Sequence, residues 1–296
     1  MSESAVYRPH PEAPAKATLR SKASGIIPSG NWTGLRADRF ELVSRGDFVQ
    51  GILYRRAEVT ADDASNDVSK KSCPLLLIQH ALGESTEASS LACAAPWAKR
   101  GLAVASIDLA LHGRRASPKL SDRLISGFQT LARGEELDLD THALVEEFTR
   151  QATSDLIRTI DALSAIPGID ADRIGFMGFG LGAIVGSYLL AHDLRPRAMV
   201  FALGGDAIGT ARGPAQFDAA TYFARASARE DTASERRRIL FVAPENASRS
   251  GQENLDALFE AAPEPKELHH FDGDARDLPK DTLQTVEDFL SQSLKF

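Results

Sequence analysis

Short apolar segments recur at regular intervals along most of this chain, and they predict the strands of a sheet. Six such segments occupy residues 74–80, 102–110, 173–180, 198–205, 238–244 and 266–271. Continuous apolar runs of this length are typical of parallel strands that are buried on both faces. We therefore expect these six segments to be buried parallel strands.

Two further segments, which precede these, alternate apolar and polar residues. They are DRFELVSRG, which begins at Asp38, and FVQGILYRRAEV, and they are joined at Gly46 and Asp47. Alternation with a period of two is typical of a half-buried strand, and the junction is a hairpin signal. With this hairpin, the predicted sheet has eight strands and is mostly parallel.

Segments with helical periodicity lie between the predicted buried strands. Residues 142–166 place apolar side chains at helical spacing until Pro167 and Gly168 end the pattern. The last helical segment, 279–296, begins with Pro279 in the favoured first-turn position. Its expected buried face consists of Leu283, Val286, Phe289, Leu290 and Leu294. Because strands alternate with helices, we predict an α/β fold, a doubly wound sheet with helices on both faces.

Two segments interrupt this alternation, residues 113–141 and 206–236. Both follow predicted strand ends, where open α/β sheets place ligand-binding loops, and we interpret them as two lid-like insertions. Residues 1–34 are rich in Pro, Ala, Ser and charged residues and are expected to form a flexible N-terminal arm. A single domain is then expected to span residues 35–296.

Composition and charge exclude several classes of function. The chain has 34 Lys and Arg residues against 41 Asp and Glu residues, a net charge of −7, and the basic residues are scattered. Nucleic acid is therefore not an expected partner, because phosphate backbones are bound by clustered basic residues. The N-terminus lacks the apolar region of a secretory signal, and no apolar run reaches about 18 residues. These features predict a cytoplasmic protein that does not enter a membrane.

No pattern in the sequence indicates a metal or a cofactor. His, Cys, Asp and Glu residues do not cluster with metal-ligand spacing. Cys73 and Cys93 are expected to be buried free thiols, because Cys93 lies in an apolar run. The glycine-rich segment 178–182 lacks the Lys-Ser/Thr pair of a phosphate-binding loop and the spacing of a dinucleotide fingerprint. We therefore expect neither metal nor cofactor, and the oligomeric state stays open.

This glycine-rich segment, Gly-Phe-Gly-Leu-Gly, joins a predicted strand to a predicted helix. The small outer residues, Gly178 and Gly182, allow the helix to pack closely on the strand. The central residue, Gly180, then occupies a strained position at the apex of the turn. A strand, a tight turn and a helix in this order are typical of a nucleophile elbow.

Other segments match the surroundings of such an elbow in the right order. They are QHALG (79–83), DLALHG (108–113), the approach to the turn at 155–178, RILFVAPEN (238–246) and HHFDGDARDLP (269–279). With these landmarks, residues 38–296 resemble the α/β-hydrolase superfamily, in particular its esterase and dienelactone-hydrolase-like branch. The resemblance implies the α/β-hydrolase fold, with a mostly parallel eight-stranded sheet and helices on both faces.

The same resemblance implies a catalytic triad in which each member is replaced. Gly180 stands at the nucleophile position, where the superfamily has the serine of Gly-x-Ser-x-Gly and acyl transfer needs an oxygen. Asn246 stands at the acid position, and a neutral amide cannot stabilise an imidazolium as a carboxylate does. Ala275 stands at the histidine position. We therefore predict a pseudoenzyme of the esterase-like group that has lost serine-hydrolase activity.

Backbone amide groups can still donate hydrogen bonds when the catalytic side chains are replaced. The amide of Leu181 and that of Ala81 or Leu82 are expected to form the oxyanion site, where a carboxylate or a carbonyl group could sit. The predicted function is therefore to hold a small acyl or carboxylate ligand, or a protein partner, under the lid segments.

One alternative keeps a hydrolytic activity. A water molecule activated by His270, with Asp206 as a relocated acid, would hydrolyse an ester without the serine. Against this alternative, His269 and His270 fit the alternation of the last strand, with one side chain packed and the other solvated. Asp206 fits a turn or a cap as well as it fits a catalytic role.

Three other polar side chains near these positions receive structural interpretations. His80 and His112 lie at strand ends, and the resemblance implies that they position loops by hydrogen bonding. Ser187 lies in the helix after the turn and is expected to face the core, which makes it a poor nucleophile.

Overall fold

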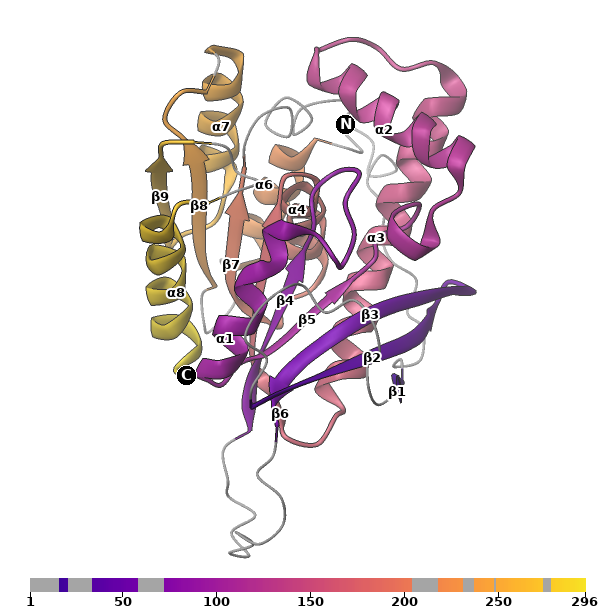
Figure 1. The fold of residues 1–296 in the computed structure, drawn as a ribbon. Helices are drawn as coiled ribbons and strands as arrows, with labels where there is room; N and C mark the ends of the chain where they lie inside the picture. The colour runs from indigo at the N-terminus through magenta and orange to yellow at the C-terminus, as the bar shows by residue number, and fades with distance from the viewer. Residues whose placement is uncertain are drawn as a thin grey trace, which may run out of the picture.

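The computed structural model describes residues 16–20, 34–57, 72–203, 218–230, 237–247, 249–273 and 278–296. Within these ranges the chain forms a nine-stranded sheet with helices on both faces (Figure 1). The strands are β1 (Thr18–Arg20), β2 (Leu35–Ser44), β3 (Asp47–Arg56), β4 (Cys73–Gln79), β5 (Ala103–Ile107), β6 (Ile169–Phe179), β7 (Pro196–Ala202), β8 (Arg238–Pro244) and β9 (Lys266–Phe271). The helices are α1 (Ala94–Arg100), α2 (Pro118–Ala132), α3 (Leu139–Ser164), α4 (Leu181–His192), α6 (Ala219–Glu230), α7 (Arg249–Ala261) and α8 (Lys280–Leu294), with the 3₁₀ helices η3 (Ser89–Cys93) and η4 (Gly113–Arg115). None of these helices is long and apolar enough to cross a membrane.

The order of the strands across the sheet is β1-β2-β3-β5-β4-β6-β7-β8-β9. The pairs from β1 to β5 are antiparallel, and the pairs from β5 to β9 are parallel. The predicted, mostly parallel α/β sheet is confirmed, and all eight expected strands are present. The ninth strand, β1, corrects the prediction: it pairs with residues 39–41 of β2 and belongs to the segment assigned to the N-terminal arm. The rest of that arm, apart from residues 16, 17 and 34, lies outside the described residues.

The hairpin of β2 and β3 closes through a two-residue turn. Ser44 pairs with Asp47, so the turn consists of Arg45 and Gly46, one residue earlier than predicted. Both turn residues have positive φ angles, 49° for Arg45 and 83° for Gly46. Two-residue turns with these angles match the right-handed twist of the strands, so the pairing continues up to the turn.

Successive side chains of the central strands enter two separate hydrophobic cores. In β4, Leu75 and Leu77 belong to one core, whereas Leu76 and Ile78 belong to the other. This alternation follows from the two-residue repeat of a strand. Helices α3, α4, α6 and α7 pack into the first core, and α1 and α8 cover the opposite face of the sheet (Figure 1). The sheet is therefore doubly wound, as predicted.

The C-terminal edge of the sheet differs from the prediction in two details. β9 pairs with β8 alone, and Phe271 is the one buried residue among its six, because an edge strand has a neighbour on one side only. Pro279 precedes the first turn of α8 instead of lying within it. The predicted inner face of α8 is confirmed: Val286, Phe289, Leu290 and Leu294 are buried, and Leu283 is half-buried.

The first predicted insertion, residues 113–141, is fixed to the core. It carries η4 and α2, and Leu124 and Phe128 of α2 are buried in the core that also contains α3. α3 begins three residues before its predicted start, because the carboxylate of Asp138 accepts hydrogen bonds from two amides of its first turn. Of the second insertion, residues 206–236, the structure describes α6 and the residue before it.

A buried arginine ties the first insertion to the rest of the fold. The guanidinium of Arg115, in η4, donates hydrogen bonds to Asp155 of α3 at 2.7 Å and to Asp47 of the hairpin at 2.6 Å. It also donates to the carbonyl of Asp108, just after β5, at 3.0 Å. The carboxylate of Asp155 is buried, and Gln151 donates to its other oxygen. These contacts hold the loop after β5 against α3 and the hairpin.

Candidate functional site

The glycine-rich turn lies where β6 ends and α4 begins. Gly180 joins Phe179 to Leu181 with φ 51° and ψ −113°. Residues with a side chain do not favour this combination of angles. The amide of Gly180 donates to the carbonyl of Ala202 in β7 at 2.9 Å, which anchors the apex to the neighbouring strand. Gly180 therefore forms the apex of a strand, turn and helix.

The two outer glycines of the turn are required by close backbone approaches. A Cβ atom on Gly178 would lie 2.4 Å from backbone atoms of Gly182 and Ala183. A Cβ atom on Gly182 would lie 2.6 Å from the carbonyl oxygen of Gln79 and 2.7 Å from that of His80. No other residue fits at either position without moving the backbone. The first turn of α4 is therefore packed directly against the end of β4.

The loop after β4 carries the other half of the predicted oxyanion site, and we call residues 80–88 the oxyanion loop. The amide of Glu84 donates to the carbonyl of Ala81 at 3.2 Å, which forms a turn. In the opposite direction, the amide of Ala81 donates to the Oε2 atom of Glu84 at 3.1 Å. Of the two donors that the sequence offered, Ala81 and Leu82, the first is therefore engaged by a side chain of its own loop.

The amides of Leu82 and Leu181 have no acceptor within the described part of the chain. Leu181 is the first residue of α4, and amides in the first turn of a helix are good donors to an anion or a carbonyl oxygen. Because Gly182 lies against the carbonyls of residues 79 and 80, the segments that carry the two amides are adjacent. Of the three amides that the sequence analysis predicted as donors, those of Leu82 and Leu181 are thus the two without an acceptor in the described part of the chain.

Two buried histidines support the oxyanion loop. The Nε2 atom of His80 accepts a hydrogen bond from the amide of Leu109 at 3.2 Å, and its Nδ1 atom lies 2.9 Å from the carbonyl oxygen of Ala81. These partners require a neutral ring with the proton on Nδ1. Burial, reinforced by the neighbouring His112, lowers the pKa of His80 to about 3. His112 is also buried, with Nδ1 2.8 Å from the carbonyl oxygen of Ala110, and its Nε2 atom has no partner among the described residues. His80 thus joins two loops as predicted, whereas the hydrogen bond of His112 stays within its own loop.

Asp108 joins the oxyanion loop to the loop after β5. Its buried carboxylate accepts hydrogen bonds from the amide of Thr86 at 2.8 Å and from that of Arg114 at 3.2 Å. Burial raises the pKa of Asp108, although the hydrogen bonds from Thr86 and the charge of Arg115 act in the opposite direction. A Cβ atom on Gly113 would lie 2.4 Å from the carboxylate, so glycine is needed there. The Asp-x-x-x-x-Gly run of the sequence therefore acts as a clamp between two loops.

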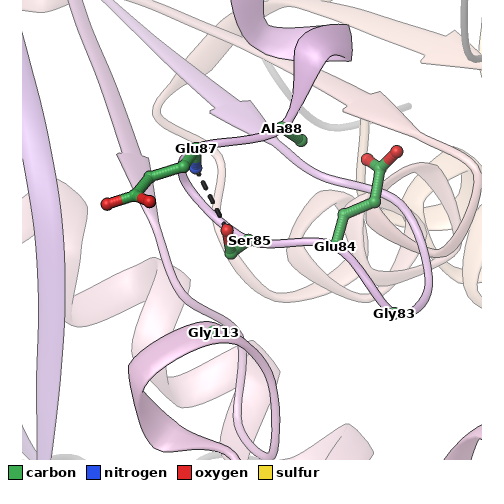
Figure 2. A pocket seen from close by; sticks show the side chains of 6 residues that line it. All are labelled: Gly83, Glu84, Ser85, Glu87, Ala88 and Gly113. Carbon is green, nitrogen blue, oxygen red and sulfur yellow. Dashed lines mark hydrogen bonds between the residues drawn. The ribbon is translucent and has the colours of Figure 1, made fainter. Parts of the chain in front are cut away.

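A cleft of about 310 Å³ opens beside these two loops (Figure 2). It is lined by Gly83, Glu84, Ser85, Glu87, Ala88 and Gly113. Figure 2 shows that the side chains of Glu84 and Glu87 leave the oxyanion loop in different directions. The carboxylate of Glu87 lies 3.7 Å from the guanidinium of Arg39 and 3.5 Å from that of Arg114. The titratable side chains that line this cleft are therefore acidic.

Of the predicted acid and histidine positions, the structure describes the first, Asn246. Asn246 is exposed in the turn after β8, next to Glu245, whose amide donates to the carbonyl of Phe271 at 2.8 Å. Ala275 and Asp206 lie outside the described residues, and the roles assigned to them stay predictions. At the acid position the structure thus shows a solvated neutral amide.

The alternative base, His270, lies in β9 beside His269, as the strand alternation predicted. His269 is half-buried, with Nε2 3.4 Å from the hydroxyl of Thr282, and His270 is exposed. Phe179 of β6 is aligned across β7 and β8 with His269 of β9. The next residue of each strand end, Gly180 and His270, is therefore aligned in the same way, three strands apart. Because neighbouring strands are about 4.8 Å apart, roughly 14 Å separates the two backbones. An imidazole side chain is too short to reach the apex of the turn across that distance.

Other candidate nucleophiles are buried. Ser187 donates to the carbonyl of Ile184 within α4 at 2.6 Å and lies in the core, as predicted. Cys93 is a buried free thiol, and burial raises its pKa to about 12. Cys73 is also a free thiol, but it is half-buried, because it is the first residue of β4. Among the described residues, no group of His, Cys, Asp and Glu could hold a metal ion.

Glu84 is the residue of this site that sequence analysis did not identify. The available signal was its spacing, since a glutamate three residues after an amide can return its carboxylate to that amide. The pattern Ala-Leu-Gly-Glu at residues 81–84 has this spacing, with Gly83 at a positive φ angle of 77°.

Comparisons with known proteins bear on the fold. No protein-family model matches the chain, and no curated protein matches it either. Among solved structures, an acetyl xylan esterase from Paenibacillus sp. R4 is similar, with a TM-score of 0.65 and 15% identity over 95% of this chain and 90% of that one. A cold-adapted esterase from an Arctic intertidal metagenomic library has a TM-score of 0.61 and 19% identity over 88% and 95% of the two chains. For a putative dienelactone hydrolase from Klebsiella pneumoniae subsp. pneumoniae MGH 78578, the values are 0.57 and 15% over 87% and 99%.

These similarities, together with the sheet order and the strand, turn and helix at Gly180, show that the chain has the α/β-hydrolase fold. The predicted similarity to esterases and dienelactone hydrolases is confirmed at the level of the fold. At identities of 15–19%, the function of this chain has to be argued from the residues of its own site.

We expect the stability of the protein to decrease as the pH falls below about 6.5. The pKa of His80 is about 3 in the folded chain, whereas an exposed histidine has a pKa of about 6.5. Below pH 6.5 the unfolded chain therefore binds a proton that the folded chain does not. The contribution of neutral His80 is complete above that pH and falls by about 1.4 kcal/mol per pH unit below it, until the pH approaches 3.

Urea denaturation at several pH values between 6.5 and 4.5 measures this slope. His80→Gln keeps an acceptor for the amide of Leu109 but does not titrate, so its slope should be shallower by about 1.4 kcal/mol per pH unit. His270→Gln, at an exposed position, is the control and should keep the wild-type slope. Equal slopes for His80→Gln and the wild-type chain would show that His80 is not buried in its neutral form.

Gly180→Ser is expected to lower the free energy of unfolding by about 1–3 kcal/mol, because a Cβ atom returns to backbone angles that only glycine adopts freely. The new hydroxyl should not hydrolyse esters, since a serine without a base is a weak nucleophile. Chemical denaturation and an ester assay on the same preparation check both statements. An unchanged midpoint would contradict the strain argument, and turnover would show that a base already serves this position.

Proposed function

We propose that this protein has lost serine-hydrolase activity and that it binds a small acyl or carboxylate ligand. The observation that carries the proposal is Gly180, which occupies the apex of the turn and has no side-chain oxygen to form an acyl intermediate. Asn246 and Ala275, at the assigned acid and histidine positions, support the loss because neither supplies a carboxylate or a base.

The ligand is held by backbone amides in this proposal. A carbonyl or carboxylate oxygen would accept hydrogen bonds from Leu82 and Leu181, and neither donor depends on the missing serine. A cleft of about 310 Å³, lined by residues that follow Leu82 in the oxyanion loop and by Gly113, has room for a short acyl chain. Similar structures are named as esterases, and an ester carbonyl is one chemical form of the proposed ligand.

Loss of the covalent route predicts that a fluorophosphonate probe does not label the chain. It also predicts that short-chain p-nitrophenyl esters are not turned over above the rate of a heat-denatured sample. Mass spectrometry of the treated protein and an absorbance assay measure the two quantities on one preparation. An adduct within residues 173–190 would refute the assignment of Gly180, and turnover without an adduct would favour a water-activating mechanism instead.

Ligand binding predicts that short-chain acyl compounds raise the melting temperature, and that the rise grows with ligand concentration. A donor test is possible at Leu181, because proline is tolerated at the first position of a helix but has no amide hydrogen. Leu181→Pro should therefore abolish the ligand-dependent rise. Leu181→Ala removes the same buried side chain but keeps the amide, so it should retain the rise and serves as the matched control.

Two outcomes would contradict the donor assignment. Retention of the full rise in Leu181→Pro would show that this amide does not bind the ligand. No rise in the wild-type chain across a panel of acids, esters and amides would favour a protein partner at this site.

A further inference from the structure

The amide of Leu82 lies at the end of a series of hydrogen bonds. It shares a peptide group with the carbonyl of Ala81, which accepts a hydrogen bond from the Nδ1 atom of His80 at 2.9 Å. The Nε2 atom of the same ring accepts the amide of Leu109 at 3.2 Å. A trans peptide group is planar, and its N–H and C=O bonds point in opposite directions. The N–H of Leu82 therefore points away from the ring of His80.

The same pattern is repeated one step further along the series. The amide of Leu109 shares a peptide group with the carbonyl of Asp108, which accepts a hydrogen bond from the guanidinium of Arg115 at 3.0 Å. The buried guanidinium also donates to Asp155 at 2.7 Å and to Asp47 at 2.6 Å. Three acceptors thus fix Arg115, and Arg115 holds the peptide group whose N–H binds His80.

We propose that Arg115 is a positioning residue of the ligand site, which orients the amide of Leu82 through the ring of His80. This inference rests on the proposed ligand-binding function and names the residue that aligns one of its two donors. Every link donates in the same direction, from Arg115 towards Leu82, and hydrogen bonds in such a chain polarise one another. The chain therefore fixes the direction of the Leu82 amide and makes it a better donor to a carbonyl oxygen.

The segment that Arg115 holds contacts the oxyanion loop at a second point. The carboxylate of Asp108 accepts the amide of Thr86 at 2.8 Å. His80 is the first residue of this loop and Thr86 is close to its end, so residues 108 and 109 hold the loop on both sides of Leu82. A shift of this short segment therefore moves the loop that carries the ligand donor.

A second arginine of similar connectivity separates this role from a general contribution to stability. Arg195 also donates to two carboxylates, those of Asp161 and Asp193, and to one carbonyl, that of Ile157 at 3.3 Å. It lies beside the C-terminal end of α4, whereas the ligand donor Leu181 is the first residue of that helix. Arg195→Lys is therefore the matched control for Arg115→Lys.

The experiment records the amide NMR signals of the ligand-free chain and then titrates it with butyramide. Lysine keeps the positive charge beside Asp155, but its ammonium group cannot reproduce the planar fork that serves three acceptors. We expect Arg115→Lys to move the amide proton signals of Leu109 and Leu82 upfield and to weaken butyramide binding about tenfold. Arg195→Lys should leave both signals in place and the dissociation constant within a factor of two.

A second pair of variants interrupts the chain at His80 and keeps the test decisive if Arg115→Lys does not fold. Glutamine offers an oxygen to the amide of Leu109 and an N–H to the carbonyl of Ala81, so His80→Gln should retain butyramide binding. Methionine has no N–H to donate and only a weak acceptor, so His80→Met should weaken binding about tenfold. Circular dichroism checks that both variants are folded.

Three results would overturn the inference. They are unchanged Leu82 and Leu109 signals in folded Arg115→Lys, equal losses of affinity in Arg115→Lys and Arg195→Lys, and equal affinities of His80→Gln and His80→Met. The proposed function fails separately: if the wild-type chain does not bind butyramide but Arg115→Lys moves both signals, the ligand is wrong and the orienting role of Arg115 is supported.

Discussion

The architecture of the site depends on one close contact, between the first turn of α4 and the end of β4. At Gly182 the helix backbone lies so near the carbonyls of Gln79 and His80 that no Cβ atom fits between them. Gly178 allows the equally close return of the chain from β6 into the helix. This contact places the amide of Leu181 beside the loop that carries Leu82, because each amide lies within a few residues of the touching atoms. In the proposed function it is this contact that brings together two donors that are about 100 residues apart in the sequence.

Around this contact the site is built from backbone groups, and side chains act mainly as supports. Neutral His80 connects the oxyanion loop to the strand end at Leu109, and Asp108 connects the same loop to Arg114. Arg115 then fixes that second loop to Asp155 in α3. All three supporting side chains are largely removed from water, where each unmade hydrogen bond would be costly, so the loops have few alternative arrangements. Such a framework does not depend on the side chain at the apex of the turn, and under the proposed function it supplies the backbone donors of the site.

The fold and the chemistry of this protein are therefore supported by different observations. The sheet order and the similarity to esterase structures define the α/β-hydrolase fold (Figure 1). The proposed loss of the covalent route depends on a few positions, above all Gly180, which has no side-chain oxygen.

The sequence by itself determined the strand pattern, the helices and the glycine-rich turn, because each depends on neighbouring residues and their periodicity. It also placed Gly180 at the apex of that turn, and the family resemblance predicted that His80 positions a loop. Tertiary structure alone decided that the amide of Ala81 is engaged by Glu84, whereas that of Leu82 has no acceptor within the described part of the chain. It likewise decided that β9 is an edge strand, with His270 roughly 14 Å from the apex, and that a short strand, β1, extends the sheet. These outcomes depend on loop geometry and on contacts between distant segments, which local patterns of hydrophobicity do not encode.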